Sequence, residues 1–241
     1  MSFLARLFGA TPTDPKAAKL FDNISPMSAE AFERKQRSIK FLKEKGVPIM
    51  GELPAIEDSK NSKIRAPKQI SERIIGCMIC AVGGETGDRQ LTAKLIDEYS
   101  AEKFLTTAEK NFLLNGIDDR QQRVQFSWRY ERVWVLLWAL GYIDRLDYPP
   151  SICDMPKLVG LIKNKSVEQL LKDAKPRSQK ELLDEADLIY RLNWAVVDER
   201  VNKKVSVPKE VETGVVEERH AALNWLIGYL NQEWDEITTD T

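Results

Sequence analysis

The chain has 241 residues, of which 43% are hydrophobic and 30% are charged, as is typical of a folded protein that forms one large domain or two small ones. Its 36 Lys and Arg residues offset 37 Asp and Glu residues, so the net charge of −1 gives no overall field that would attract nucleic acid or an anionic membrane. The longest apolar run, Val133 to Leu140, is far shorter than the roughly 20 residues of a membrane-spanning helix, so we expect a soluble protein.

The first 26 residues have the pattern of an extension that precedes the folded domain. Four apolar side chains within the first eight residues would share one side of a short helix, which favours docking on the domain over a membrane anchor, with disorder as the alternative. Three prolines between Thr11 and Pro26 indicate a linker. We therefore predict an N-terminal extension and linker over residues 1–26 and a single helical domain over residues 27–241.

The first half of that domain carries clear helix signals. Ser28 is an N-cap residue type, and we expect a helix from it to Gly46. Pro48 and Pro54 favour extended backbone over residues 47–56. Further helices are predicted at 69–82, where a glycine pair ends the apolar run, at 89–99, and at 107–114, which opens with a capping box.

The most apolar stretch of the sequence lies at its centre. We expect one helix from about Arg120 to Tyr142, apolar all round in its second half and therefore buried. Helix starts follow near Asp154, at Ser166 and at Ser178, and further helices are predicted to about Val201 and over 215–231. With a second minor extended segment at 205–211, the pattern predicts an all-α, compact multi-helix domain of about eight helices.

The sequence lacks several common catalytic and metal-binding patterns. Cys77 and Cys80 have the spacing of a redox or zinc pair, but they lie inside an apolar helix, and only Cys153 and His220 are obvious further ligands. We therefore interpret these cysteines as packed core residues and expect no metal and no cofactor. His220 is the only histidine, and the glycines of 83–87 lack the Lys and Ser/Thr of a phosphate loop. Three cysteines, an odd number, favour a reducing, cytoplasmic location over a disulfide framework.

The most informative feature is a set of polar residues on helices that should be buried. A charge in an apolar environment costs several kcal/mol unless it is paired, so these residues should meet one another. Asp187 precedes Arg191 by four residues, which is the favourable order for a helical ion pair. The hypothesis is one half-buried polar cluster lined by tryptophans; the alternative is a structural network that fixes helix register and binds no ligand. The candidate cluster comprises Glu131, Asp187, Arg191, Glu218, His220 and Asn224, and the lining comprises Trp134, Trp138, Trp194 and Trp225.

Four segments carry a family pattern. They are Arg37 to Pro48 with Leu53-Pro54, Tyr130-Glu131 with Val135 to Gly141, Asp187 to Ala195, and Glu218 to Leu226 with Trp234-Asp235. With these segments the chain resembles the bacterial domain of unknown function 4272 (DUF4272) over nearly everything after about residue 30. The resemblance implies no activity and no catalytic residues, but its segments include all six polar residues of the candidate cluster. The extension over residues 1–26 is the departure from the family pattern.

These observations favour a non-catalytic interaction protein, for example an immunity-type or regulatory module that binds another protein. The alternative is a small-molecule or nucleotide-processing enzyme, with Glu131 or Glu218 as base, Arg191 holding an anionic group and His220 as acid or base. Nucleic-acid binding through the basic residues of the early helices is weaker than either, and we expect no membrane partner.

Overall fold

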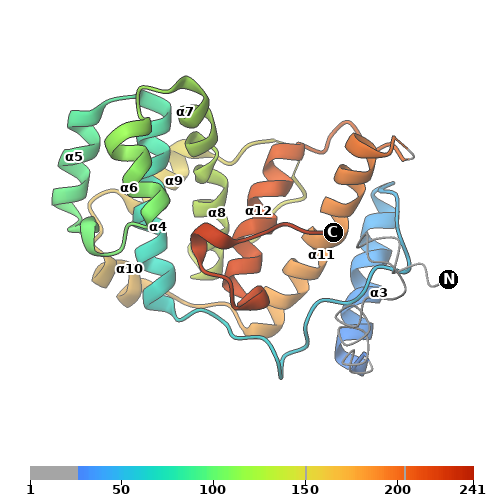
Figure 1. Ribbon diagram of the computed structural model, residues 1–241. Helices are drawn as coiled ribbons and strands as arrows, with labels where there is room; N and C mark the ends of the chain where they lie inside the picture. The colour runs from blue at the N-terminus through green and yellow to red at the C-terminus, as the bar shows by residue number, and fades with distance from the viewer. Residues whose placement is uncertain (1–26, 150, 204) are drawn as a thin grey trace, which may run out of the picture.

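The computed structural model describes residues 27–149, 151–203 and 205–241, and within these residues it contains helices and no strand (Figure 1). The predicted all-α fold class is therefore confirmed, and the two extended segments form no sheet. The predicted extension, residues 1–26, lies outside the described residues. No helix in the described part of the chain is long and apolar enough to cross a membrane.

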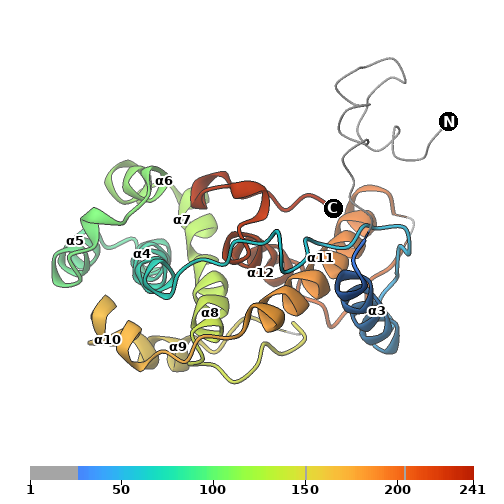
Figure 2. The same cartoon turned by 90° about the horizontal axis from the view of Figure 1, so that it is seen from below.

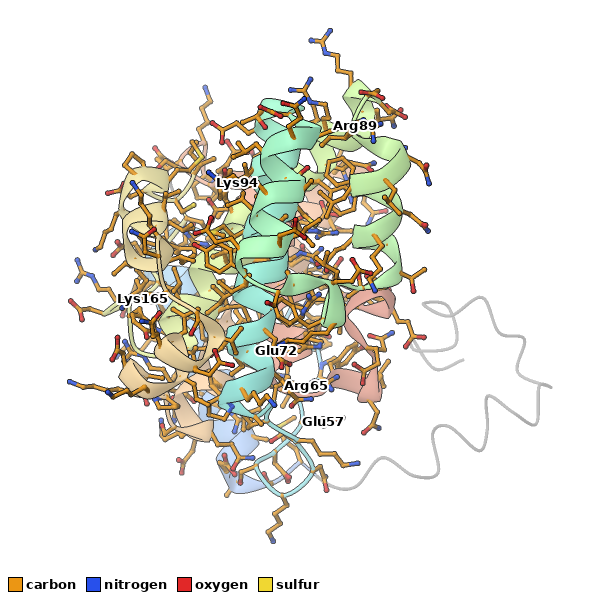
Figure 3. The ribbon with its side chains drawn as sticks, turned by 90° about the vertical axis from the view of Figure 1, so that its left-hand side faces the viewer. Glu57, Arg65, Glu72, Arg89, Lys94 and Lys165 are labelled. Carbon is orange, nitrogen blue, oxygen red and sulfur yellow. The ribbon has the colours of Figure 1, made fainter. Side chains whose placement is uncertain are left out.

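Helix α4 (Pro67–Thr86) is the axis of one half of the molecule (Figures 1 and 2). Its most extensive contacts are with α7 and α8, and α5 and α10 also pack against it. Seen from the side of α5, α4 runs behind the shorter helices, and charged side chains such as Arg89 and Lys94 lie on this outer face (Figure 3). The elements of this half are α5 (Arg89–Glu98), η1 (Ala101–Lys103), α6 (Thr107–Asn111), the π-helical turn η2 (Phe112–Gly116), α7 (Arg120–Ser127), α9 (Met155–Ile162) and α10 (Val167–Asp173).

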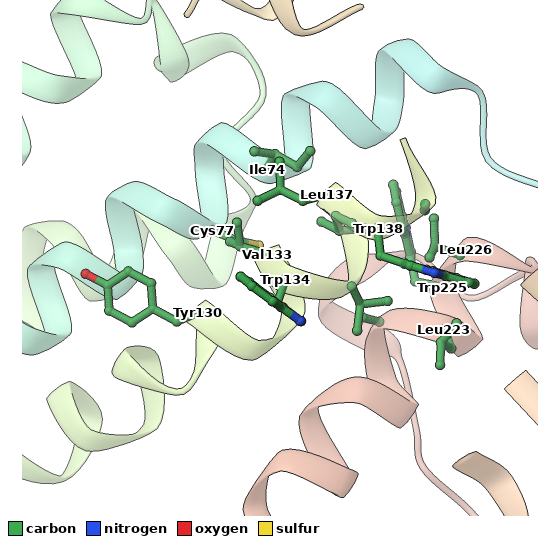
Figure 4. Packing of buried hydrophobic residues seen from close by; sticks show 14 of the residues in the cluster. Ile74, Cys77, Tyr130, Val133, Trp134, Leu137, Trp138, Leu223, Trp225 and Leu226 are labelled. Carbon is green, nitrogen blue, oxygen red and sulfur yellow. The ribbon is translucent and has the colours of Figure 1, made fainter. Parts of the chain in front are cut away.

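Helix α8 (Arg129–Ala139) joins the two halves, because it packs on α4 at one side and on α12 (Thr213–Leu226) at the other. Helix α12 packs on α11 (Gln179–Val201), which packs on α3 (Ala29–Glu44). Side chains of α4, α8 and α12 meet in one continuous hydrophobic core (Figure 4). The remaining elements are the short turns η3 (Tyr229–Asn231) and η4 (Trp234–Glu236).

The predicted helix starts agree with the observed caps. The Ser28 hydroxyl accepts the Ala31 N–H at 3.1 Å at the start of α3. Reciprocal capping boxes open α6, α10 and α11 at Thr106, Ser166 and Ser178. These short-range signals are reliable here because each cap satisfies backbone N–H groups that have no partner within the helix.

Several predicted helix boundaries are wrong, including those of the helices predicted at 107–114 and 215–231, since α6 ends at Asn111 and α12 at Leu226. The segment predicted as one helix from Arg120 to Tyr142 is divided into α7 and α8 at Trp128, next to which the Ser127 hydroxyl donates to the Val124 carbonyl at 2.8 Å. The helix predicted to end at Val82 continues through the glycine pair to Thr86. The glycine is needed for packing, because a Cβ on Gly84 would lie 2.6 Å from the Arg123 carbonyl oxygen and 2.6 Å from the Ser127 nitrogen of α7.

Basic side chains hold the irregular segment between α3 and α4. Lys35 donates to the Leu53 carbonyl at 2.6 Å, Arg191 to the Pro54 carbonyl at 3.0 Å, and Arg34 to the Glu57 carbonyl at 3.0 Å. These bonds replace the strand pairing that this extended segment lacks, so its carbonyl groups keep donor partners.

Residues 232–239 form a strap across both halves of the molecule. The Trp234 ring lies 5.4 Å from the guanidinium of Arg73 and 5.4 Å from that of Arg132. Further along the strap, the Asn224 side chain donates to the Thr238 carbonyl at 2.9 Å, and the Asn193 side chain donates to the Thr239 carbonyl at 3.1 Å. The strap therefore makes specific contacts with α4, α8, α11 and α12.

We expect Gly84→Ala to destabilise the protein by about 1–3 kcal/mol, because the added methyl group would force α7 away from α4. Gly160→Ala is the matched control: its Cβ would meet nothing within 4 Å, so it should stabilise α9 by about 0.5–1 kcal/mol. Urea unfolding of both variants measures the two changes. Equal stability of the two variants would contradict the close approach of α4 and α7.

Candidate functional site

Asp187 and Arg191 form a fully buried ion pair one turn apart on α11. Arg191 Nε and Nη2 donate to the two carboxylate oxygens at 2.9 and 2.8 Å. Because Arg191 also binds the Pro54 carbonyl, the pair anchors the segment between α3 and α4. Nearby, burial and the adjacent Arg191 charge lower the pKa of Lys35, against the opposing effect of Asp187.

Glu131 and Glu218 belong to two other interactions. Glu131 accepts the Cys153 backbone N–H on Oε1 and Arg219 Nε on Oε2, the latter at 3.3 Å. Glu218 accepts Arg129 Nη1 at 3.1 Å and Arg132 Nε at 2.5 Å. Burial by itself would raise the pKa of Glu218, but the two arginines hold it below its ordinary value. Both carboxylates are therefore neutralised by neighbouring arginines.

His220 and Asn224 lie on α12 without joining these ion pairs. His220 is 1% exposed, its Nδ1 has no hydrogen-bond partner, and its ring centroid lies 6.1 Å from that of Tyr190. Burial lowers the pKa of His220 to about 3, so the imidazole is neutral at physiological pH. Asn224 holds the strap through the Thr238 carbonyl.

The structure therefore places the predicted cluster residues in separate interactions. Within the described residues, no hydrogen bond or ion pair connects Arg191, His220 and either glutamate to one another. Three of the four tryptophans each have a different cation against the ring: Lys157 at Trp134, Arg177 at Trp138 and Arg65 at Trp225. Trp134, Trp138 and Trp225 fill the core between α4, α8 and α12 (Figure 4), and Trp194 is half-buried on α11.

A pocket of about 600 Å³, called the large pocket below, lies between α4, α7, α8 and the residues around the start of α9. Its size lies within the range of pockets that bind small molecules. Glu131 is the one candidate-cluster residue in its wall. The lining residues are Gly84, Glu85, Arg120, Arg123, Val124, Ser127, Trp128, Tyr130, Glu131, Ile152, Cys153 and Met155.

The polar groups of this pocket are mostly bound to other groups of the protein. The Tyr130 hydroxyl donates to Glu85 Oε2 at 2.8 Å, and burial together with that carboxylate raises the pKa of Tyr130. Burial and the adjacent Glu131 raise the pKa of the Cys153 thiol well above its usual range. Neither group is therefore ionised at neutral pH, and Cys153 lacks the thiolate character of a nucleophile.

Two apolar side chains lie at the mouth of the pocket, together with the exposed residues Glu85 and Arg120. Val124 on α7 is 54% exposed and Ile152 is 53% exposed, although both are large hydrophobic residues. Sequence reasoning missed both. The signal that could have found Val124 is a lone β-branched residue within the polar run of α7, Arg120 to Gln125.

Glu185 is a further residue that the sequence does not single out. It lines a cavity of about 170 Å³ between α3 and α11, with Arg34, Arg37 and Asp184 in the same wall. Burial raises the pKa of Glu185 to about 7, against the opposing charge of Arg219 and with a further rise from Asp184. A half-buried carboxyl group in this position titrates near neutral pH.

Comparison with known proteins gives one match. The model of the family described as domain of unknown function (DUF4272) matches residues 34–237. No curated protein and no solved structure matches the chain. In the described part of the chain, no three His, Cys, Asp or Glu residues are grouped so that they could hold a metal ion.

We expect the ring signals of His220 to stay unchanged in NMR spectra between pH 8 and pH 5, because the folded-state pKa is about 3. The protein has one histidine, so the assignment needs no variant. In urea the same signals should titrate near the ordinary value of about 6.5. This pKa difference removes stability as pH falls below about 6.5, because the unfolded state then binds the proton first. A folded-state midpoint between pH 6 and 7 would contradict the burial of this side chain.

Glu185 should have the opposite effect on stability. Between its ordinary pKa of 4.5 and about 7, the folded state keeps a proton that the unfolded state releases, so stability falls as pH rises through this window. Glu185→Gln should abolish the fall and be more stable than the native chain by about 1–3 kcal/mol at pH 8, with little difference at pH 4.5. Urea unfolding at both pH values measures this. Glu217→Gln, at an exposed position of α12, is the control.

Proposed function

The chain belongs to the DUF4272 family, and we propose that it is a non-catalytic module that binds another protein by accepting an apolar side chain into the pocket between α4, α7 and α8. The observation that carries this proposal is a pocket with a largely apolar surface whose lining includes two exposed large hydrophobic residues. Val124 and Ile152 are 54% and 53% exposed, and a protein surface that places a side chain in the pocket would cover both of them.

The enzyme alternative has less support. Of its four residues, Glu131 alone lines the large pocket, and both of its oxygens accept hydrogen bonds from the protein. The lowered pKa of Glu218 makes it a weak base, and His220 is enclosed and neutral. Arg191 is already paired with Asp187. These groups have the properties of structural interactions that hold a binding surface in shape.

The proposal includes the location and the domain organisation. Cys77, Cys80 and Cys153 are free and buried, which supports a reducing, cytoplasmic compartment. One continuous core with residues from α3, α4, α8, α9, α10, α11 and α12 supports a single helical domain over residues 27–241. An immunity-type or regulatory role fits a module whose activity is binding alone.

We expect the double variant Val124→Glu/Ile152→Glu to lose its partner, because two carboxylates at the mouth would have to be desolvated on binding. The native chain is used to recover a partner from cells that carry the gene, and the dissociation constant is then measured with purified proteins. The double variant should bind at least about 100-fold more weakly. Val201→Glu, at a 65% exposed position on α11, should bind as the native chain does. Equal binding by all three chains, each with native stability, would contradict the proposed site.

A further inference from the structure

The pocket wall on α7 carries two arginines without a carboxylate partner. Arg120 and Arg123 lie one helical turn apart and both line the pocket. Within the described residues, Arg120 makes no ion pair or hydrogen bond through its side chain, while Arg123 binds only neutral acceptors, the Gly84 and Glu85 carbonyls at 3.1 and 2.9 Å.

Other arginines of this region are paired with acids. Arg89 contacts Asp118 at 2.6 Å, and Arg129 contacts Glu218 at 3.1 Å. The contrast is informative because an arginine beside a partly desolvated pocket gains most from a charged acceptor, which it can bind through two parallel hydrogen bonds.

The acidic residues of the pocket leave this positive charge largely uncompensated. Glu131 is paired with Arg219 from α12, so its charge is neutralised from outside the pocket. Glu85 is the remaining acid, and its carboxylate accepts the Tyr130 hydroxyl. Arg120, Arg123 and Glu85 together leave one net positive charge beside the pocket, which a single carboxylate would balance.

We infer that the protein partner carries a carboxylate next to the apolar side chain that fills the pocket, and that Arg120, with Arg123 behind it, binds this carboxylate. The inference rests on the proposed function and names the chemistry of the partner: an apolar anchor residue with an acidic neighbour. The apolar walls, Val124, Trp128, Ile152 and Met155, bind the anchor, and α7 supplies the specificity for the charge.

A matched pair of fluorescent probes tests this chemistry. Pyrenebutyrate and pyrenebutanol share one apolar body, and only the first carries a carboxylate. Fluorescence titration of the full chain should show saturable binding of both probes at one site, with pyrenebutyrate bound about tenfold more tightly, the ratio of one charge-assisted hydrogen bond. Arg120→Gln should reduce this preference below about threefold and leave the affinity for pyrenebutanol unchanged. Arg200→Gln, at a 66% exposed position outside the pocket, should keep the full preference.

The outcomes separate this inference from the proposed function. If both probes bind equally to the native chain, or if Arg120→Gln and Arg123→Gln both keep the preference, the carboxylate site is wrong while the pocket stands. If neither probe binds the native chain, the proposed binding pocket is wrong. It is also wrong if the double variant Val124→Glu/Ile152→Glu binds both probes as tightly as the native chain does. The purified partner should displace pyrenebutyrate. A partner that binds and leaves the probe in place would show that the site serves a free amphiphile, which contradicts the inference.

Discussion

The buried ion pair between Glu131 and Arg219 is the interaction on which the arrangement of this molecule depends. It joins α8 to α12, and each partner also binds the backbone of the connection to α9: Glu131 at the Cys153 N–H, and Arg219 at the Asp147 carbonyl at 2.7 Å. That connection supplies one wall of the large pocket. Loss of either partner would leave an unpaired charge inside the core, so the pair fixes the pocket wall and the contact between the two halves at the same time.

The same principle holds for most buried charges of this protein. Arg73 is paired with Glu109, Asp187 with Arg191, and Glu218 with two arginines, and these groups bind backbone segments or neighbouring helices. These paired charges hold the helices and connecting segments in one arrangement. The surface around the pocket carries apolar side chains and the arginines of α7. For the proposed partner, a scaffold of this kind would present a preformed surface, which reduces the entropic cost of association.

The sequence predicts those features of the fold and site that depend on neighbouring residues, and it does not predict those that depend on residues far apart in the chain. Helix starts at Ser28, Thr106 and Ser178 follow from local capping chemistry, and the spacing of Asp187 and Arg191 indicates their ion pair. The polar run from Glu217 to His220 contains Arg219, but its pattern does not show which residue faces a carboxylate on another helix. The pocket is assembled from residues near 84, 120–131 and 152–155, and no local periodicity relates segments so far apart. The glycine pair of α4 has the local pattern of a helix end, whereas its role, the close approach of α4 to α7, is set by tertiary packing.

The strap over residues 232–239 has a consequence for how the protein is made. Synthesis proceeds from the N-terminus, and domains form as their segments emerge from the ribosome. Until the strap has emerged, the amides of Asn193 and Asn224 lack their carbonyl acceptors, and the Trp225 ring lacks its edge-on neighbour Trp234, 5.0 Å away. The two halves can therefore reach their final packing only after translation has passed this late segment, and a nascent chain that stalls before it would expose apolar surface that chaperones recognise.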